Sequence, residues 1–437
     1  MIEAVLLALG VMILLIVLGT HIAVGLGLSA MLGVYLMMEN FDIVLALLAD
    51  TAYDAVRNYI FAVIPLFILM GDIVSRSGLA GDVYRLCNRM LIWLPGRLAV
   101  STVLGNAIFA AVSGVSVAAA ASFSRIAYPE MDKYQYNRKL ALGSIAGSSV
   151  LGMLIPPSIL LIVWAVMTEM SIGALFVAGV VPGLVLAAMF CGYCVLRALR
   201  SPGMAPNVRQ DEVASSPDEL RRELSGGVGV VVLVSLVLGG LWGGLFTPTE
   251  AAGIGVMGAL VLGIIRGMKI PDIYQAVLHA GQTAAPIMLL LVAAQLYSRM
   301  LAMGGVVPEL QHWVTAAELS PFLLILAMMG VWLVMGMFVD SVSIILLTIP
   351  VFAPMAQIAG FDALAFAIFG ILVIEAGLLT PPFGLVCYTV KGAIPDPSVT
   401  LQEIFSAVLP YIAMVLVVAA LVLVIPALAT WLPAVAF

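Results

Sequence analysis

Long apolar runs recur from one end of the chain to the other, and short polar segments separate them. Runs of about 17–25 apolar residues are typical of helices that cross a lipid bilayer. The pattern predicts membrane-spanning helices at 4–20, 22–38, 60–76, 139–170, 172–197, 227–246, 249–266, 284–302, 361–390 and 403–432. No basic segment typical of a cleaved signal peptide precedes the first run, so we expect it to be retained as a span.

Two further apolar stretches, 98–125 and 320–355, are each long enough for two half-length helices. Each has small or polar residues in its middle, Ser113-Gly114-Val115-Ser116 in the first and Asp340-Ser341-Val342-Ser343 in the second. Because a helix that crosses once needs no such interruption, both stretches are predicted to be re-entrant helical hairpins.

Three shorter segments are amphipathic. Residues 79–95 and 305–318 alternate apolar and polar positions with helical spacing, and residues 40–59 resemble them. Such helices lie along the membrane interface, either as arms that connect moving and static parts or as plain linkers. The sequence leaves both interpretations open.

Composition agrees with a membrane protein. The chain is 63% hydrophobic and only 10% charged, whereas soluble proteins are about 45–50% apolar and 25% charged. The net charge of −6 argues against a nucleic-acid partner. Little sequence remains for a sizeable extramembrane enzyme domain, and the four cysteines lie in apolar or amphipathic stretches that imply no disulfide framework. The predicted class is an all-α polytopic membrane protein.

The basic residues predict an orientation. If both hairpins re-enter and the N-terminus is outside, all of the 18 Lys and Arg residues except Arg57 and Arg299 face the cytoplasm. An excess of Lys and Arg marks cytoplasmic segments. The first hairpin is therefore expected to open to the cytoplasm and the second to the periplasm, with both termini periplasmic.

The chain also matches itself at an offset of about 221–228 residues. The two hairpin centres align, Pro65 aligns with Pro286, and Gly152–Pro157 aligns with Gly377–Pro382. The predicted domains are residues 1–199 and 226–437, joined by a polar cytoplasmic linker at 200–225 to which we assign no chemistry. Because the two copies start on opposite sides, the repeat is inverted, as in many secondary transporters with a site at mid-membrane.

Polar groups within the membrane are costly and usually functional. The proline pairs remove backbone donors and leave carbonyl oxygens around Gly152 and Gly377 without intrahelical partners. Such oxygens suit Na⁺, the one coupling ion or cofactor we expect. One predicted Na⁺ site joins the first hairpin tip to the first helix break: Ser113, Gly114, Ser116, Gly152 and Pro156. The other joins the second tip to the second break: Asp340, Ser341, Ser343, Gly377, Thr380 and Pro381.

These assignments have alternatives. Ser113 and Asp340 each precede a half-helix, so helix capping alone would account for them. Glu375 has no carboxylate at the equivalent position of the first copy, so it is either a site residue or a paired polar residue of the core. No catalytic residue is predicted.

The half-helices that begin at the hairpin tips direct partial positive charge toward mid-membrane and favour a carboxylate or another anion. Ser113, Ser116, Asp340 and Ser343 are therefore also candidates for substrate binding. The expected activity is cation-coupled uptake of an organic anion.

Several of these motifs resemble a known family, the large membrane subunit of tripartite ATP-independent periplasmic (TRAP) transporters. The resemblance covers essentially the whole chain and rests on Ala110–Gly114, Ile126–Met131, Leu151–Ser158, Gly336–Asp340 and Gly377–Gly384. By this resemblance the hairpin serines and Asp340 correspond to cation or substrate positions. Val115 departs from the family, whose tip often has a polar residue there.

The resemblance implies a Na⁺-driven elevator-type importer of organic acids in a bacterial inner membrane. Its expected substrates are C4-dicarboxylates, sialic acid, other sugar acids or keto acids. Its expected partners are a small four-helix membrane subunit and a periplasmic substrate-binding protein.

Three other functions stay open. A stand-alone Na⁺/carboxylate symporter shares inverted repeats and hairpins but needs no binding protein. An ion channel would use the same breaks as a filter. An intramembrane enzyme is disfavoured because the sequence offers no nucleophile–base pair or metal cluster.

Overall fold

The computed structural model describes residues 1–437 except 58, 207–216, 317–319 and 437, and the described chain folds into helices. Eight of the described helices are long and apolar enough to cross a membrane. Six shorter apolar helices accompany them, including those at the predicted first two spans. The chain is therefore an all-α, multi-pass membrane protein, as its composition predicts.

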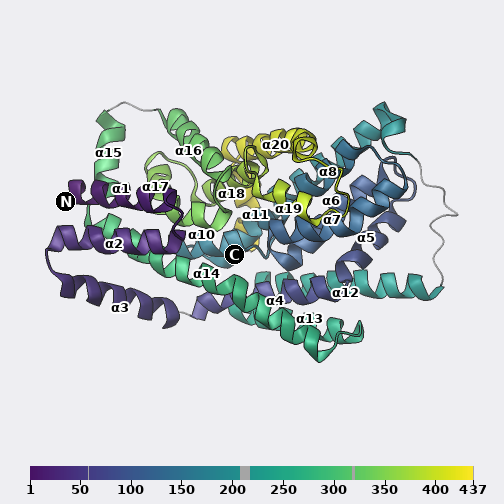
Figure 1. The fold of residues 1–437 in the computed structure, drawn as a ribbon, viewed down its shortest axis with the longest axis horizontal. Helices are drawn as coiled ribbons and strands as arrows, with labels where there is room; N and C mark the ends of the chain where they lie inside the picture. Colours follow the sequence, from purple (N-terminus) through teal and green to yellow (C-terminus); the bar gives the residue numbers. More distant parts are fainter. Residues whose placement is uncertain (58, 207–216, 317–319, 437) are drawn as a thin grey trace.

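One group of helices includes a long oblique helix, α14, which crosses the lower half of the view in Figure 1. Within it, α2 packs against α1 and α14, and α4 packs against α13 and α14. Its members are α1 (Ile2–Val17), α2 (Ile22–Met38), α3 (Phe41–Arg57), α4 (Val63–Arg76), α12 (Pro217–Trp242), α13 (Pro248–Ile265) and α14 (Ile270–Met303).

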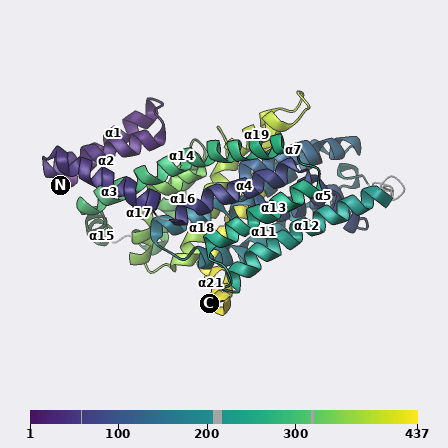
Figure 2. The ribbon, with the colours of Figure 1, turned by 90° about the horizontal axis from the view of Figure 1, so that it is seen from below.

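A second group contains the interrupted helices. Its members are α6 (Arg97–Ser113), α7 (Ser116–Lys133), α8 (Arg138–Ser149), α9 (Leu151–Leu154), α10 (Ile159–Thr168), α11 (Ile172–Arg200), α16 (Pro321–Gly336), α17 (Ser341–Ile358), α18 (Ala363–Leu379), α19 (Leu385–Ala393), α20 (Leu401–Val424) and α21 (Ala427–Ala436). Helices far apart in sequence lie together here: α8 packs on α20 (Figure 1), and α7 packs on α19 (Figures 1 and 2).

Both predicted interruptions are present. The first stretch is divided into α6 and α7 at Gly114 and Val115, and the second into α16 and α17 before Ser341. The second limbs are longer than hydropathy predicted, since α7 reaches Lys133 and α17 reaches Ile358. In α7 the extension is polar and carries the helix past the apolar run, which is why an apolar window underestimates it.

Two amphipathic helices connect the groups, α5 (Leu79–Met90) and α15 (Val306–Ala316). On the buried side of α5, Asp82 forms ion pairs with Arg85 and with Arg266 at the end of α13. Glu223 of α12 pairs with Arg85 at 3.3 Å. Glu223 lies in the polar first part of α12, which begins at Pro217, ahead of the apolar part. These ion pairs fix α5 to the α12–α13 pair.

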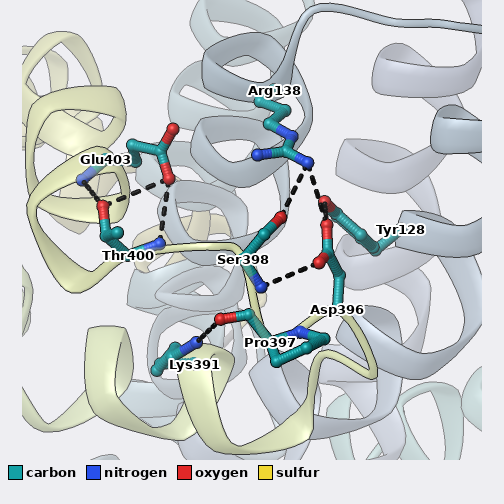
Figure 3. A network of polar contacts seen from close by, with 8 residues as sticks. All are labelled: Tyr128, Arg138, Lys391, Asp396, Pro397, Ser398, Thr400 and Glu403. Carbon is teal, nitrogen blue, oxygen red and sulfur yellow. Dashed lines mark hydrogen bonds and ion pairs between the residues drawn. The ribbon is translucent and has the colours of Figure 1, made fainter.

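At the end of the first hairpin a polar network joins the two halves of the sequence (Figure 3). The Tyr128 hydroxyl of α7 and the Arg138 guanidinium of α8 both donate to Asp396 Oδ2, each at 3.1 Å. Ser398, two residues further along, donates to the same carboxylate and, with these contacts, holds the pKa of Asp396 below its usual value. The loop before α20 is thus fastened to the base of the first hairpin.

The second hairpin is fixed by a buried aromatic cluster. The indole N–H of Trp332 in α16 donates to the Thr348 hydroxyl of α17 at 2.8 Å. The Trp332 ring packs against Trp164 of α10 and Phe366 of α18. Because the tryptophan's polar atom has a partner, its full burial carries no unsatisfied donor.

The first testable prediction concerns the contact between α16 and α18. A Cβ atom at Gly336 would lie 2.7 Å from the Cα atom of Gly377, so Gly336→Ala forces the backbones apart and should lower the free energy of unfolding by about 1–3 kcal/mol. Gly330 lies on the same helix with open space at its Cβ position, so Gly330→Ala should be neutral or stabilising. Thermal unfolding of both variants in detergent measures the difference; equal stabilities would contradict this close contact.

Candidate functional site

The first hairpin tip is held directly by the first helix break. Gly114 adopts a left-handed backbone conformation with φ of +61°, and a Cβ there would lie 2.7 Å from the Pro157 carbonyl oxygen. Only glycine fits both demands without strain. The N–H of Ile159 donates to the Gly114 carbonyl at 3.3 Å, so the start of α10 supplies a backbone partner for the tip.

The other residues of the first predicted site lie in the same place. A Cβ at Gly152 in α9 would be 3.1 Å from the backbone nitrogen of Ser116, and Pro156 forms a cis peptide bond with Pro157. The hydroxyls of Ser113 and Ser116 are buried without a hydrogen-bond partner. Ser113, Gly114, Ser116, Gly152 and Pro156 are therefore brought together.

At the second tip, Asp340 acts as an N-cap. Its carboxylate accepts from the Ser343 N–H at 3.0 Å and from the Ser343 hydroxyl at 2.5 Å. The Asp340 side chain is exposed, whereas Ser341 and Ser343 are buried. Asp340 is therefore the N-cap of α17, and any role of its carboxylate as a ligand would be in addition to capping.

The second break repeats the first. Pro381 and Pro382 are joined by a cis peptide bond, at the position equivalent to Pro156 and Pro157. The Gly377 carbonyl, expected to be free, accepts from the Thr380 N–H at 2.9 Å, and the Thr380 hydroxyl donates to Ala376. Thr380 thus replaces part of the bonding that Pro381 removes, and the expectation of an unbonded Gly377 carbonyl was wrong.

Glu375 lies between the two tips. It is 1% exposed, and its Oε1 accepts from the Ser341 hydroxyl of the second hairpin at 2.9 Å. The Ser116 hydroxyl of the first hairpin lies near the same carboxylate but makes no hydrogen bond to it. Its Oε2 atom is buried with no hydrogen-bond partner. One carboxylate therefore faces residues from both halves of the chain.

In the comparison of the two halves of the sequence, Glu375 received little weight as a site residue, because the residue at the equivalent position of the first half is not acidic. The signal that could have found it is a lone carboxylate inside the apolar run of α18. Asn106 was also missed. This buried side chain donates to the Ser148 hydroxyl at 2.6 Å, and its own carbonyl oxygen has no partner. Ser148 in turn bonds its own helix at Ser144.

The chemistry of this region is that of oxygen ligands. The described residues contain no group of three or more His, Cys, Asp or Glu side chains arranged for a metal. The tips and breaks instead offer hydroxyls, backbone carbonyls and one buried carboxylate. Hard cations with flexible coordination accept such a set.

Comparisons with known proteins agree with this arrangement. The sequence profile of the family described as "Tripartite ATP-independent periplasmic transporter, DctM component" matches residues 9–428. The chain is 34% identical to the C4-dicarboxylate TRAP transporter large permease protein DctM of Pseudomonas aeruginosa, over 90% of each chain. It is 30% identical to the ectoine TRAP transporter large permease protein TeaC of Halomonas elongata, over 93% of each.

Among solved structures, the fold is similar to the YdaH transporter of Alcanivorax borkumensis, with a TM-score of 0.64 at 13% identity over 90% of this chain and 89% of that one. MtrF of Neisseria gonorrhoeae gives 0.63 at 14% identity, over 91% and 85%. The helices and the paired tips and breaks define a membrane transport protein. The chain belongs to the family of large membrane subunits of TRAP transporters, which confirms the resemblance seen in its motifs.

The second prediction separates capping from other roles of Asp340. Asp340→Ala removes the acceptor for the Ser343 N–H and should lower the free energy of unfolding by about 1 kcal/mol, whereas Asp340→Asn keeps a good cap. Asp362 caps α18 in the same way, accepting from Ala365 N–H at 2.9 Å, so Asp362→Ala is the matched control. Thermal unfolding without Na⁺ provides the measurement. Equal loss in Asp340→Ala and Asp340→Asn would mean that the charge, not the cap, stabilises this tip.

Proposed function

We propose that this chain is the permease subunit of a Na⁺-driven importer of small organic acid anions. The observation that carries the proposal is the buried Glu375 carboxylate, which has an unpartnered oxygen and hydroxyls from both hairpin tips beside it. A buried carboxylate without a full set of donors is costly unless a cation or a proton accompanies it.

Na⁺ fits this environment. The first cation site is formed by Ser113, Gly114, Ser116, Gly152 and Pro156, and the second by Asp340, Ser341, Ser343, Gly377, Thr380 and Pro381. The unpartnered Ser113 and Ser116 hydroxyls supply oxygen atoms to the first. Glu375 supplies negative charge next to both.

An anionic substrate follows from the helix ends. α7 and α17 begin at the hairpin tips and direct their N-termini toward the same region. Relatives are named for C4-dicarboxylate, for ectoine and for 2,3-diketo-L-gulonate, and each of these compounds carries a carboxylate group. The substrate class of this chain is therefore a small carboxylate, with Ser113, Ser116, Asp340 and Ser343 as its first contacts.

The transport mechanism we infer is an elevator movement of the second helix group against the first, in two inverted repeats. The amphipathic helices α5 and α15 suit the connecting arms, because each joins one group to the other in sequence. Family membership brings a periplasmic substrate-binding protein and a small membrane subunit as partners, in the bacterial inner membrane. The distribution of Lys and Arg supports periplasmic termini.

The third prediction tests coupling. In proteoliposomes with the small subunit, an inward Na⁺ gradient and external binding protein, we expect uptake that needs both Na⁺ and the binding protein. Glu375→Gln and Asp340→Asn should each reduce the rate more than tenfold, because a charged oxygen ligand is lost while the shape is kept. Glu169→Gln removes an exposed carboxylate elsewhere and serves as the control.

Full Na⁺-driven uptake without the binding protein would replace this proposal with the stand-alone symporter. Unchanged uptake in Glu375→Gln would remove the carboxylate from the cation sites.

The fourth prediction tests the inverted topology. Lys133 and Gln357 are exposed residues near the ends of α7 and α17, the second limbs of the two hairpins. Single cysteines at these positions should react with a membrane-impermeant thiol reagent from opposite sides, Lys133→Cys from the cytoplasm and Gln357→Cys from the periplasm. Labelling from one common side would contradict the inversion.

A further inference from the structure

A cavity of about 630 Å³ lies between α4, α7 and α14. At one end it reaches Ser113 and Val115 of the first hairpin tip. α4 closes this end, since a Cβ at Gly71 would lie 2.8 Å from the Cα atom of Ser113. The cavity is therefore continuous with the predicted substrate and cation positions at the tip.

Two helix faces form its walls. On α7 the lining residues run from Val117 to Arg125 with helical spacing, and on α4 they run from Ile68 to Arg76. Ten residues separate Val115 from Arg125 along the chain, which corresponds to about 15 Å of helix. The walls thus lead from the buried tip to a charged end, on the side that the basic residues assign to the cytoplasm.

The acid among the cavity-lining residues is Asp72, which directly follows Gly71 on α4 and is partly neutralised. Asp72 binds Arg76 Nε through Oδ2 at 2.6 Å and His279 Nδ1 through Oδ1 at 3.1 Å. The Arg76 and His279 side chains are 36% and 55% exposed. Both oxygens of Asp72 are therefore occupied, and this acid neither repels an anion strongly nor remains available to another cation.

Arg125 lies at the charged end of the cavity, ten residues along the chain from Val115. Among the cavity-lining residues, all of which the structure describes, it is the arginine without an acidic partner, and its side chain is exposed. An arginine guanidinium pairs with a carboxylate through two parallel hydrogen bonds. Arg125 thus leaves a net positive charge at the open end of a cavity that begins at the hairpin tip.

We propose that Arg125 is a second carboxylate-binding position, which receives the substrate after it leaves the hairpin tip and selects for anions on the route to the cytoplasm. This inference rests on the proposed function for the direction of travel. A four-carbon diacid is much shorter than the distance from the tip to Arg125, so the two positions are occupied one after the other. Because Arg125 is exposed, its pair with a carboxylate is weak and permits release.

The fifth prediction tests the attraction of anions without requiring transport. A cysteine replacing Ala121, which lines the cavity one helical turn from Arg125, is reacted with anionic sulfonatoethyl and cationic trimethylammonioethyl methanethiosulfonate. In the full-length protein, Arg125→Gln should lower the ratio of anionic to cationic reaction rates about tenfold, because one nearby charge acts oppositely on the two reagents. The protein without the added cysteine gives the background from its native cysteines.

Lys133→Gln is the matched control, since Lys133 is an exposed cation on the same helix that does not line the cavity. Its distance from residue 121 exceeds the screening length at physiological salt, so the ratio should not change. Succinate, but not its neutral diamide, should protect the cysteine, and Arg125→Gln should abolish that protection. An unchanged rate ratio, no protection by succinate, or equal protection by the diamide would each overturn the role of Arg125.

These outcomes do not depend on the uptake experiment. Loss of Na⁺-driven uptake in the unsubstituted protein would refute the proposed function, while the reagent ratios would still report the anion-binding position.

Discussion

The constraint on which this structure depends is that backbone polar groups inside a bilayer must find partners within the protein. A hairpin tip and a proline-broken helix each expose such groups, and neither is tolerable alone. Here they lie against each other: the Ile159 N–H bonds the Gly114 carbonyl, and Gly152 lies against the backbone of Ser116. Pairing the two irregular segments removes most of the cost and leaves a few oxygens over. Those remaining oxygens lie where the tips meet the breaks, so the same requirement that shapes the fold also gathers the unpaired polar groups in one place.

Glu375 restricts how the two hairpins can move relative to each other. Its Oε1 is bonded to Ser341 of one hairpin, and Ser116 of the other lies beside the same carboxylate. Displacing one hairpin alone would leave this buried charge with fewer compensating dipoles, at a cost of the order of several kcal/mol. At the base of the first hairpin, Asp396 ties Tyr128 and Arg138 to the loop before α20. The Glu375 contacts therefore favour a common displacement of both hairpins, and the Asp396 contacts favour movement of the first hairpin together with the loop before α20.

Much of this architecture is readable from the sequence because membrane helices follow simple length and polarity rules. Ser113–Ser116, Asp340–Ser343 and the two proline pairs marked the interruptions, since polar residues and prolines inside an apolar run are costly in an unbroken membrane helix. The positions of individual partners were not readable. Hydropathy could not show that Glu223 pairs with Arg85, or that the Thr380 N–H bonds the Gly377 carbonyl. Glu375 was undervalued because it breaks the symmetry between the halves, whereas a single carboxylate can be shared by both. The sequence therefore located the two interruptions but not the carboxylate that lies between them.

The two ends of the cavity between α4, α7 and α14 differ in how strongly they can hold an anion. At the tip, Ser113 and the start of α7 act in a buried, low-dielectric setting, where dipoles and cations are felt strongly. At the open end, Arg125 acts in water, where the same pairing is weak. In the mechanism we propose, a carboxylate that binds at the first position with the coupling cations loses affinity when the cations leave, and the weak second position then offers it a favourable contact without trapping it. Strong buried binding followed by weak exposed binding is the order that allows a carrier both to select an anion and to release it.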